Sequence, residues 1–368
     1  MSLTILEFIG GLVILIIGAD LLVRGASKLA AAYGVSPLAI GLTIVAIGTA
    51  SPEIAVSLQA ASLGQGSLTL GNVLGSNIFN ILFVLGVTAL VAPIVIAEQL
   101  IRLDAPIMVG ISVLAFSLAA DGRLGLFDGL ILLAGVIAYT VFALRQSRKE
   151  SKKVKSEYAR EFADTEAHTI SNTLKNIFFI VIGLGLLVLG ARWLVDAASS
   201  MAKSIGVSEL VIGLTVVAVG TSLPEVATSI IAAIKGESDI AVGNAIGSNI
   251  FNILGVLGIS GVAAPGGIEV STRILTFDFM VMVFVALICL PVFYVDDNVS
   301  RGEGMLFLSY YILYTSYLIL EASRSAILPG MTLFVSFYIP LTFIGLVMYT
   351  IRARRLKKKK RVEAARAE

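Results

Sequence analysis

Long apolar runs follow one another along most of the chain and are separated by short polar breaks. A helix needs about 20 mainly apolar residues to cross a bilayer. The pattern therefore predicts about eleven membrane spans, at residues 4–23, 37–62, 70–93, 103–119, 124–144, 177–195, 209–233, 241–264, 275–295, 304–320 and 329–351. The first run contains Glu7 and continues to Asp20 without a cleavage pattern, so we interpret it as a span and not as a signal peptide.

The composition agrees with this pattern. Hydrophobic residues make up 57% of the 368 residues and charged residues 14%, whereas soluble chains have about 45–50% and about 25%. These values exclude a soluble enzyme and a disordered scaffold, and they predict an all-α polytopic membrane protein. One cysteine, Cys289, and one histidine, His168, exclude an intramolecular disulfide and a His/Cys metal cluster. The net charge of +2 predicts no nucleic-acid partner.

Charged residues are most concentrated in two places. A charged segment lies at residues 146–175, and the basic run RARRLKKKKR, from Arg352 to Arg361, follows the last span. Positive clusters beside spans favour the cytoplasm. Six predicted spans separate the two clusters, and an even number of spans places both clusters on the same side of the membrane. We therefore expect a multi-pass protein of the cell membrane, in contact with the lipid bilayer and functional as a monomer. Its N-terminus is expected outside, and its central loop and C-terminus inside.

The chain also contains an internal repeat. The segment GADLLVRGASKLAAAYGVSPLAIGLTIVAIGTASPE begins at Gly18, and GARWLVDAASSMAKSIGVSELVIGLTVVAVGTSLPE begins 172 residues later at Gly190. The same offset relates GNVLGSNIFNIL at Gly71 to GNAIGSNIFNIL at Gly243. Each copy holds five predicted spans, and an odd number reverses the second copy in the membrane. Inverted repeats are typical of secondary transporters, whose site lies at the bilayer midplane between the copies.

This repeat predicts the organisation of the chain. The expected parts are a first inverted five-helix repeat at 1–145, a charged cytoplasmic loop at 146–175, a second repeat at 176–322, and an extra span with a basic tail at 323–368.

Two acidic residues lie inside the apolar runs at equivalent positions. Glu53 is the only charged residue between Lys28 and Glu98, and its repeat partner is Glu225. A charge at the bilayer centre costs about 2.5–3.5 kcal/mol even on the insertion scale. One such carboxyl can be structural, but two at equivalent positions of inverted repeats predict one shared site.

Proline precedes each glutamate, at Pro52 and Pro224. Proline leaves a carbonyl one turn upstream without its donor, and broken helices at membrane depth line a cavity. Thr49, Glu53 and Ser57 are spaced four apart and share a helix face. Carboxylates, hydroxyls and carbonyls form an all-oxygen site that suits Ca²⁺ or Na⁺ and not a soft metal. Two glutamates balance one Ca²⁺.

The paired blocks GTASPE with GTSLPE, and GNVLGSNIFN with GNAIGSNIFN, resemble the α-1 and α-2 repeats of the cation/calcium exchanger superfamily. They are most similar to those of its prokaryotic sodium/calcium exchangers, over about residues 5–320. The resemblance implies exchange of Na⁺ for Ca²⁺ by alternating access, with the first and sixth helices sliding against a ligand-binding bundle. It implies transported ions, no cofactor and no enzymatic activity.

The resemblance also implies roles for matching residues. Glu53 and Glu225, with the carbonyls of Thr49 and Thr221, would bind Ca²⁺, and the two carboxylates would be shared with Na⁺. Asn80 would orient a glutamate or bind water at the centre. The remaining expected ion-site residues are Ser76, Ser222 and Ser248, the carbonyls of Ala46 and Ala218, and Asn252.

Departures from the family pattern leave alternatives open. Ala50 stands where the family usually has serine, so one flanking Na⁺ site is weaker or uses Ser51. Asn252 replaces the acid typical of potassium-dependent relatives, which disfavours K⁺ transport. Proton/calcium relatives usually carry a membrane histidine, whereas His168 lies in the loop.

A proton/calcium antiporter stays the main alternative because the glutamates could bind protons, and a passive cation channel is a weaker one. An intramembrane hydrolase is disfavoured because no nucleophile and base form a pair.

Overall fold

The computed structural model describes residues 2–33, 35–149, 170–204, 218–296 and 298–367. Within these ranges, nine helices are long and apolar enough to cross a membrane. A tenth candidate span is the pair Pro37–Thr49 and Ser51–Ser62, which is bent by 48°. The prediction of a helical multi-pass protein is thus confirmed. The count of about eleven stays a prediction, because part of the expected span 209–233 lies outside the described residues.

The first half of the chain is helical apart from two short strands. Its elements are α1 (Ser2–Tyr33), α2 (Pro37–Ile40), η1 (Gly41–Val45), α3 (Ala46–Thr49), α4 (Ser51–Ser62), α5 (Gly66–Phe79), η2 (Asn80–Leu85), α6 (Gly86–Val91), β1 (Ile94–Val95), η3 (Leu100–Asp104), α7 (Ala105–Leu118), η4 (Ala119–Asp121), β2 (Arg123–Leu124) and α8 (Leu126–Lys149). η4 is a 3₁₀ turn, and the other η elements are π-helical.

The second half follows the same plan. Its elements are α10 (Ile170–Ser204), α12 (Ala218–Gly220), α13 (Leu223–Ile234), α14 (Ser238–Phe251), η6 (Asn252–Leu257), α15 (Gly258–Ala263), β3 (Ile268–Glu269), η7 (Ile274–Phe279), α16 (Met280–Asp296), β4 (Asn298–Val299), α17 (Arg301–Ala322) and α18 (Leu328–Ala367). Each short strand pairs with one from the other half, since β1 pairs antiparallel with β4 and β2 with β3.

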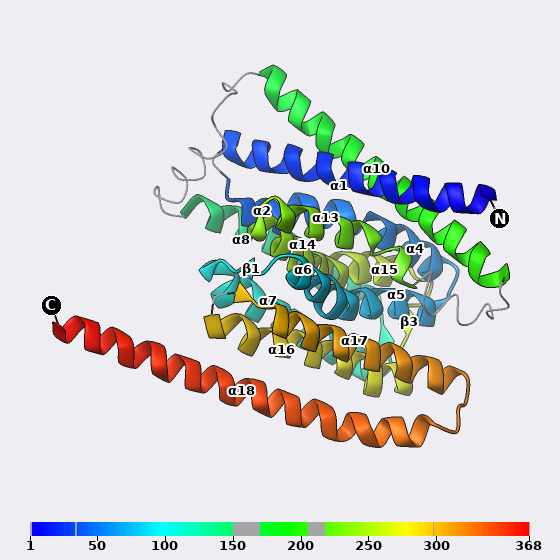
Figure 1. Ribbon diagram of the computed structural model, residues 1–368. Coiled ribbons are helices and arrows are strands. Elements are labelled where there is room, and N and C mark those ends of the chain that lie inside the picture. The colour runs from blue at the N-terminus through cyan, green and yellow to red at the C-terminus, as the bar shows by residue number, and fades with distance from the viewer. Residues whose placement is uncertain (1, 34, 150–169, 205–217, 297, 368) are drawn as a thin grey trace.

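The helices form a central bundle with long helices on two opposite faces (Figure 1). The helices α1 and α10 lie together across one face, and α18 runs along the opposite one. One buried apolar cluster fills the central bundle, and a second joins α1 and α10 to α13. The α1–α10 pair is therefore anchored to α13 through a buried cluster that is separate from the core of the central bundle.

Glycines allow α1 and α10 to approach closely. A Cβ atom at Gly18 would lie 2.8 Å from the carbonyl oxygen of Gly183, and one at Gly190 would lie 2.7 Å from the nitrogen of Leu15. Small residues at such positions let two membrane helices pack backbone against backbone. Both helices are longer than predicted. For example, α1 continues past residue 23 to Tyr33, and its Arg24 pairs with Asp20 on the same helix.

Candidate ion-binding site

Two helix breaks lie in the middle of the bundle and position the two glutamates. Ala50 interrupts the first helix at φ −76° and ψ 5°, and Ser222 interrupts the second at φ −94° and ψ 9°. Proline follows in the first turn of α4 and of α13, where its missing N–H is not needed. Glu53 and Glu225 therefore lie in the first turns of helices, where the helix dipole favours a negative charge.

Glu53 is fully buried and is contacted by two hydroxyl groups. Ser222 donates to its Oε1 at 2.8 Å, and Ser76 donates to the same oxygen at 3.4 Å. The two serine hydroxyls are 3.2 Å apart. Oε2 of Glu53 accepts no hydrogen bond within the described part of the chain. One carboxylate oxygen and two hydroxyls from three different helical segments thus form one small oxygen cluster.

Glu225 is also fully buried, but neither of its carboxylate oxygens accepts a hydrogen bond from a described residue. The hydroxyls of Thr49 and Ser248 face it and lie 3.4 Å from each other. Thr49 also donates to the carbonyl of Ala46 at 3.4 Å. The residue equivalent to Ser222 is Ala50, which has no hydroxyl. Glu225 therefore lacks a counterpart of the hydrogen bond that Ser222 donates to Glu53.

The two glutamates lie close enough for their charges to repel each other. None of the ion pairs between described residues involves either of them. Two buried carboxylates without a basic partner are unfavourable unless a cation or a proton neutralises them.

Two asparagines that sequence reasoning missed fix both helix breaks. Asn72 donates to the Glu53 carbonyl at 3.3 Å and to Ser57 at 2.8 Å, and it accepts from Thr221 at 3.5 Å. Asn244, 172 residues later, donates to the Glu225 carbonyl at 3.3 Å and to Ser229 at 3.0 Å, and it accepts from Thr49 at 3.0 Å. Each asparagine is the second residue of a repeated segment, GNVLGSNIFNIL at Gly71 or GNAIGSNIFNIL at Gly243. This shared GN dipeptide is the sequence signal that could have identified them.

Asn80 and Asn252 are fully buried at the starts of the π-helical segments η2 and η6. All four of their side-chain amide atoms lack a hydrogen-bond partner in the described residues. An unpaired buried amide is costly, and π-helical segments are frequent at functional sites. The neighbouring Asn249 donates to the Asn77 carbonyl at 3.1 Å and so joins α14 to α5.

The predicted site residues come from four broken or π-bulged spans. Nine of them are buried. They are Asn80 and Asn252, described above, and Ala46, Thr49, Glu53, Ser76, Ser222, Glu225 and Ser248. Thr221 is half-buried. Ala218 begins α12, and its side chain lies outside the described set. Their assignment as ion ligands stays a prediction.

Two further buried acids lie outside this site, and sequence reasoning missed them. Asp104 accepts a hydrogen bond from Tyr139 at 3.1 Å, and Asp278 accepts one from Tyr314 at 3.4 Å. Asp278 also pairs with Arg273. Each aspartate thus joins two successive long helices of its half of the chain.

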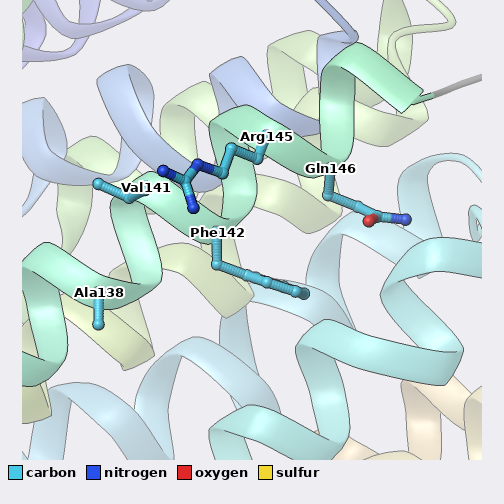
Figure 2. A pocket seen from close by; sticks show the side chains of 5 residues that line it. All are labelled: Ala138, Val141, Phe142, Arg145 and Gln146. Atoms are coloured by element: carbon cyan, nitrogen blue, oxygen red, sulfur yellow. The ribbon is translucent and has the colours of Figure 1, made fainter.

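A cavity of about 510 Å³ lies away from the glutamates, along α8. Arg145 and Gln146 line it together with Ala138, Val141 and Phe142 (Figure 2). None of the predicted ion-site residues lines this cavity, so it is not the ion site.

Broken membrane helices around a buried set of carboxylate, hydroxyl and amide oxygens define a cation transporter of the secondary type. The family model described as sodium/calcium exchanger protein matches residues 3–145 and 175–320. The chain belongs to this sodium/calcium exchanger family.

Individual relatives agree with the family. The chain is 38% identical to the inner membrane protein YrbG of Escherichia coli, over 84% of this chain and 94% of that protein. It is 34% identical to the sodium/calcium exchanger MaX1 of Methanosarcina acetivorans, over 83% and 95% of the two chains. A solved structure of the sodium–calcium exchanger NCX_Mj matches with a TM-score of 0.72 and 30% identity, over 85% of this chain and 98% of that chain. The chain is therefore a multi-pass cation/calcium antiporter and not an enzyme.

Proposed function

We propose that this chain exchanges Na⁺ for Ca²⁺ by alternating access, with the two ions competing for the carboxylates of Glu53 and Glu225. The observation that carries the proposal is the pair of fully buried glutamates, which repel each other and have no basic partner among the described residues. One Ca²⁺ neutralises both charges, and hard cations prefer such oxygen ligands.

The proposed Ca²⁺ position lies between the two carboxylates, and the carbonyls of Thr49 and Thr221 complete its ligands. Ca²⁺ takes 6–8 oxygens in flexible geometry, so the carboxylate oxygens without hydrogen bonds are suited to bind it directly. Asn72 and Asn244 hold the backbones of Glu53 and Glu225 in place, which orients the carboxylates toward each other's half of the molecule.

The proposed Na⁺ positions flank this centre and differ from each other. The first uses Glu53, Ser76 and Ser222 with the carbonyl of Ala218. The second uses Glu225 and Ser248 with the carbonyl of Ala46, and it lacks a hydroxyl at Ala50. Asn80 and Asn252 lie at the centre, where their unpaired amides would hold water or orient the glutamates. We propose that the second Na⁺ position is the weaker one.

The membrane orientation and the division of the chain are part of the same proposal. The N-terminus lies outside, and the charged loop 146–175 and the basic tail both lie in the cytoplasm. The two halves, at 1–145 and 176–322, have opposite orientations in the membrane. Residues 323–368 add a span that neither half needs for the site.

Proton coupling is the second candidate, and one observation favours it. Neither oxygen of Glu225 accepts a hydrogen bond from a described residue, so this carboxylate could take up a proton where the weaker Na⁺ position would be. The deciding experiment measures ⁴⁵Ca²⁺ uptake into proteoliposomes that contain the full chain. Uptake driven by an outward Na⁺ gradient at equal pH supports the proposal, and uptake driven only by an outward H⁺ gradient contradicts it.

A further inference from the structure

An ion pair joins the helix α1 to the end of α13, the helix that carries Glu225. Lys235 Nζ lies 2.5 Å from Asp20 Oδ1 and also donates to the Asp20 carbonyl at 3.3 Å. Asp20 Oδ2 pairs with Arg24 on its own helix at 2.8 Å. Asp20 and Lys235 are about three-tenths exposed, so the pair is partly shielded from solvent. Lys235 thus makes two contacts with a single residue of α1.

The equivalent positions in the other half cannot form this link. Residues 172 positions after Asp20 and Arg24 are Arg192 and Asp196, which are 3.9 Å apart and largely exposed. The residue equivalent to Lys235 is Leu63, which is exposed and carries no charge. The cross-link is therefore a property of one end of the molecule only.

The two broken helices also differ in how they are covered. α1 packs on α13, and Ala227 is buried in the apolar cluster that α1 shares with α13. The equivalent residue on α4, Ala55, is exposed, and its neighbours along the same face, Ser51 and Gln59, are exposed as well. The face of α13 that contains Ala227 is thus covered by α1, whereas the equivalent face of α4 is left uncovered by the described residues.

We infer that the Asp20–Lys235 ion pair holds the transporter in the state in which α1 covers α13 and the equivalent face of α4 is uncovered. Passage to the opposite state must separate α1 from α13 and break this pair, and nothing equivalent forms between α10 and Leu63. The pair therefore biases the equilibrium toward the state seen here, and Lys235 is a positioning residue for transport. This inference rests on the alternating access proposed above and not on the identity of the coupling ion.

The test uses two matched cysteine reporters in the full chain with Cys289→Ala. Ala227→Cys reports access along α13, and Ala55→Cys reports access along α4 at the equivalent position. A water-soluble maleimide is applied to protein in proteoliposomes without Na⁺ or Ca²⁺ gradients. With Lys235 present, the cysteine at position 55 should react faster than the one at position 227.

Lys235→Met should speed modification at position 227 and slow it at position 55, so that the ratio of the two rates changes by about two- to five-fold, the range of a partly exposed ion pair. Lys235→Arg should keep the original rates because it keeps the charge. Asp20→Asn combined with Lys235→Met should change the rates no further than either change alone, because both remove the same interaction.

Arg192→Gln is the matched control on α10 and should leave both reporters unchanged. Equal reporter rates with and without Lys235, or an equal effect of Arg192→Gln, would overturn the inference. The reporter reaction needs no transported ion, so a failure of Na⁺-driven uptake would contradict the proposed coupling and leave the reporter result intact.

Discussion

Ser222 reaches across the bundle and donates a hydrogen bond of 2.8 Å to Glu53, a residue 169 positions away in the other half of the chain. The reverse bond to Glu225 is missing because position 50 is alanine. The two glutamates therefore have equal burial and unequal surroundings. This difference lies inside the proposed ion site, so it should affect ion binding more than folding.

Replacing either glutamate with an isosteric amide should nearly abolish Ca²⁺ transport. Glu53→Gln and Glu225→Gln each leave a divalent ion with one compensating charge in a buried site. Breaking a buried charge pair costs about 3 kcal/mol or more, which is about 100-fold in affinity. The measurement is ⁴⁵Ca²⁺ flux in proteoliposomes, and near-normal flux in either variant would remove that residue from the site.

A binding measurement separates this effect from misfolding. Added Ca²⁺ should raise the unfolding temperature of the unmodified chain in detergent, because a ligand that binds only the folded state stabilises that state. At a Ca²⁺ concentration of 100 times Kd, the free energy of unfolding rises by about 2.7 kcal/mol. Glu53→Gln and Glu225→Gln should remain monodisperse and lose this response. A Ca²⁺-dependent shift that survives in both variants would place the Ca²⁺ site elsewhere.

Asn252→Asp should change the ion and pH dependence of transport more than it changes folding. The new carboxyl would lie at the start of η6, where the asparagine amide has no described partner. Three carboxylates around one Ca²⁺ leave an excess negative charge, which a proton or a further cation must neutralise. We expect stronger inhibition by moderate acid. Asn249→Asp provides a comparison outside the proposed site, and unchanged pH and Na⁺ profiles in Asn252→Asp would exclude Asn252 from it.

Close packing of α1 on α10 gives a prediction for stability. A methyl group at Gly18 would meet the carbonyl of Gly183 at 2.8 Å. Gly18→Ala should therefore lower the free energy of unfolding by about 1–3 kcal/mol, the usual cost of overpacking. Gly185→Ala is the matched control on α10, because an added Cβ meets no described atom there. The unfolding temperature of both variants is measured by heating and then quantifying the folded fraction by size-exclusion chromatography. Equal unfolding temperatures in Gly18→Ala and Gly185→Ala would contradict the packing argument.

Much of the site could be predicted from the sequence because its chemistry is local. Glu53 with Pro52, and Glu225 with Pro224, mark the two helix breaks by residue type alone. The repeated GN dipeptide could have marked Asn72 and Asn244 as residues of interest. Their contacts could not be predicted, since they depend on how α5 and α14 pack against the breaks. The Asp20–Lys235 pair was out of reach for the same reason, because it requires knowing which helix covers α13. The Asp104–Tyr139 and Asp278–Tyr314 pairs were missed although both acids interrupt apolar runs.

Voltage should reveal how many Na⁺ ions exchange for each Ca²⁺. The two glutamates are neutralised by one Ca²⁺, and if the same site loads three Na⁺, the two loaded forms differ by one positive charge. Moving that charge is coupled to voltage at about 2.3 kcal/mol per 100 mV. Ca²⁺ uptake into Na⁺-loaded vesicles should speed up when a potassium–valinomycin potential makes the interior positive, because net positive charge then leaves.

Ala50 is the residue that decides this outcome. If its missing hydroxyl removes one Na⁺ position beside Glu225, exchange becomes two-for-one and electroneutral. A rate that is indifferent to imposed voltage in both directions would contradict the three-sodium hypothesis. Ala50→Ser should then restore the voltage dependence, because it returns to Glu225 the hydroxyl that Ser222 supplies to Glu53. The matched change Ser222→Ala should reduce Na⁺ affinity on the Glu53 side, and an unchanged Na⁺ dependence in both variants would show that these hydroxyls are not sodium ligands.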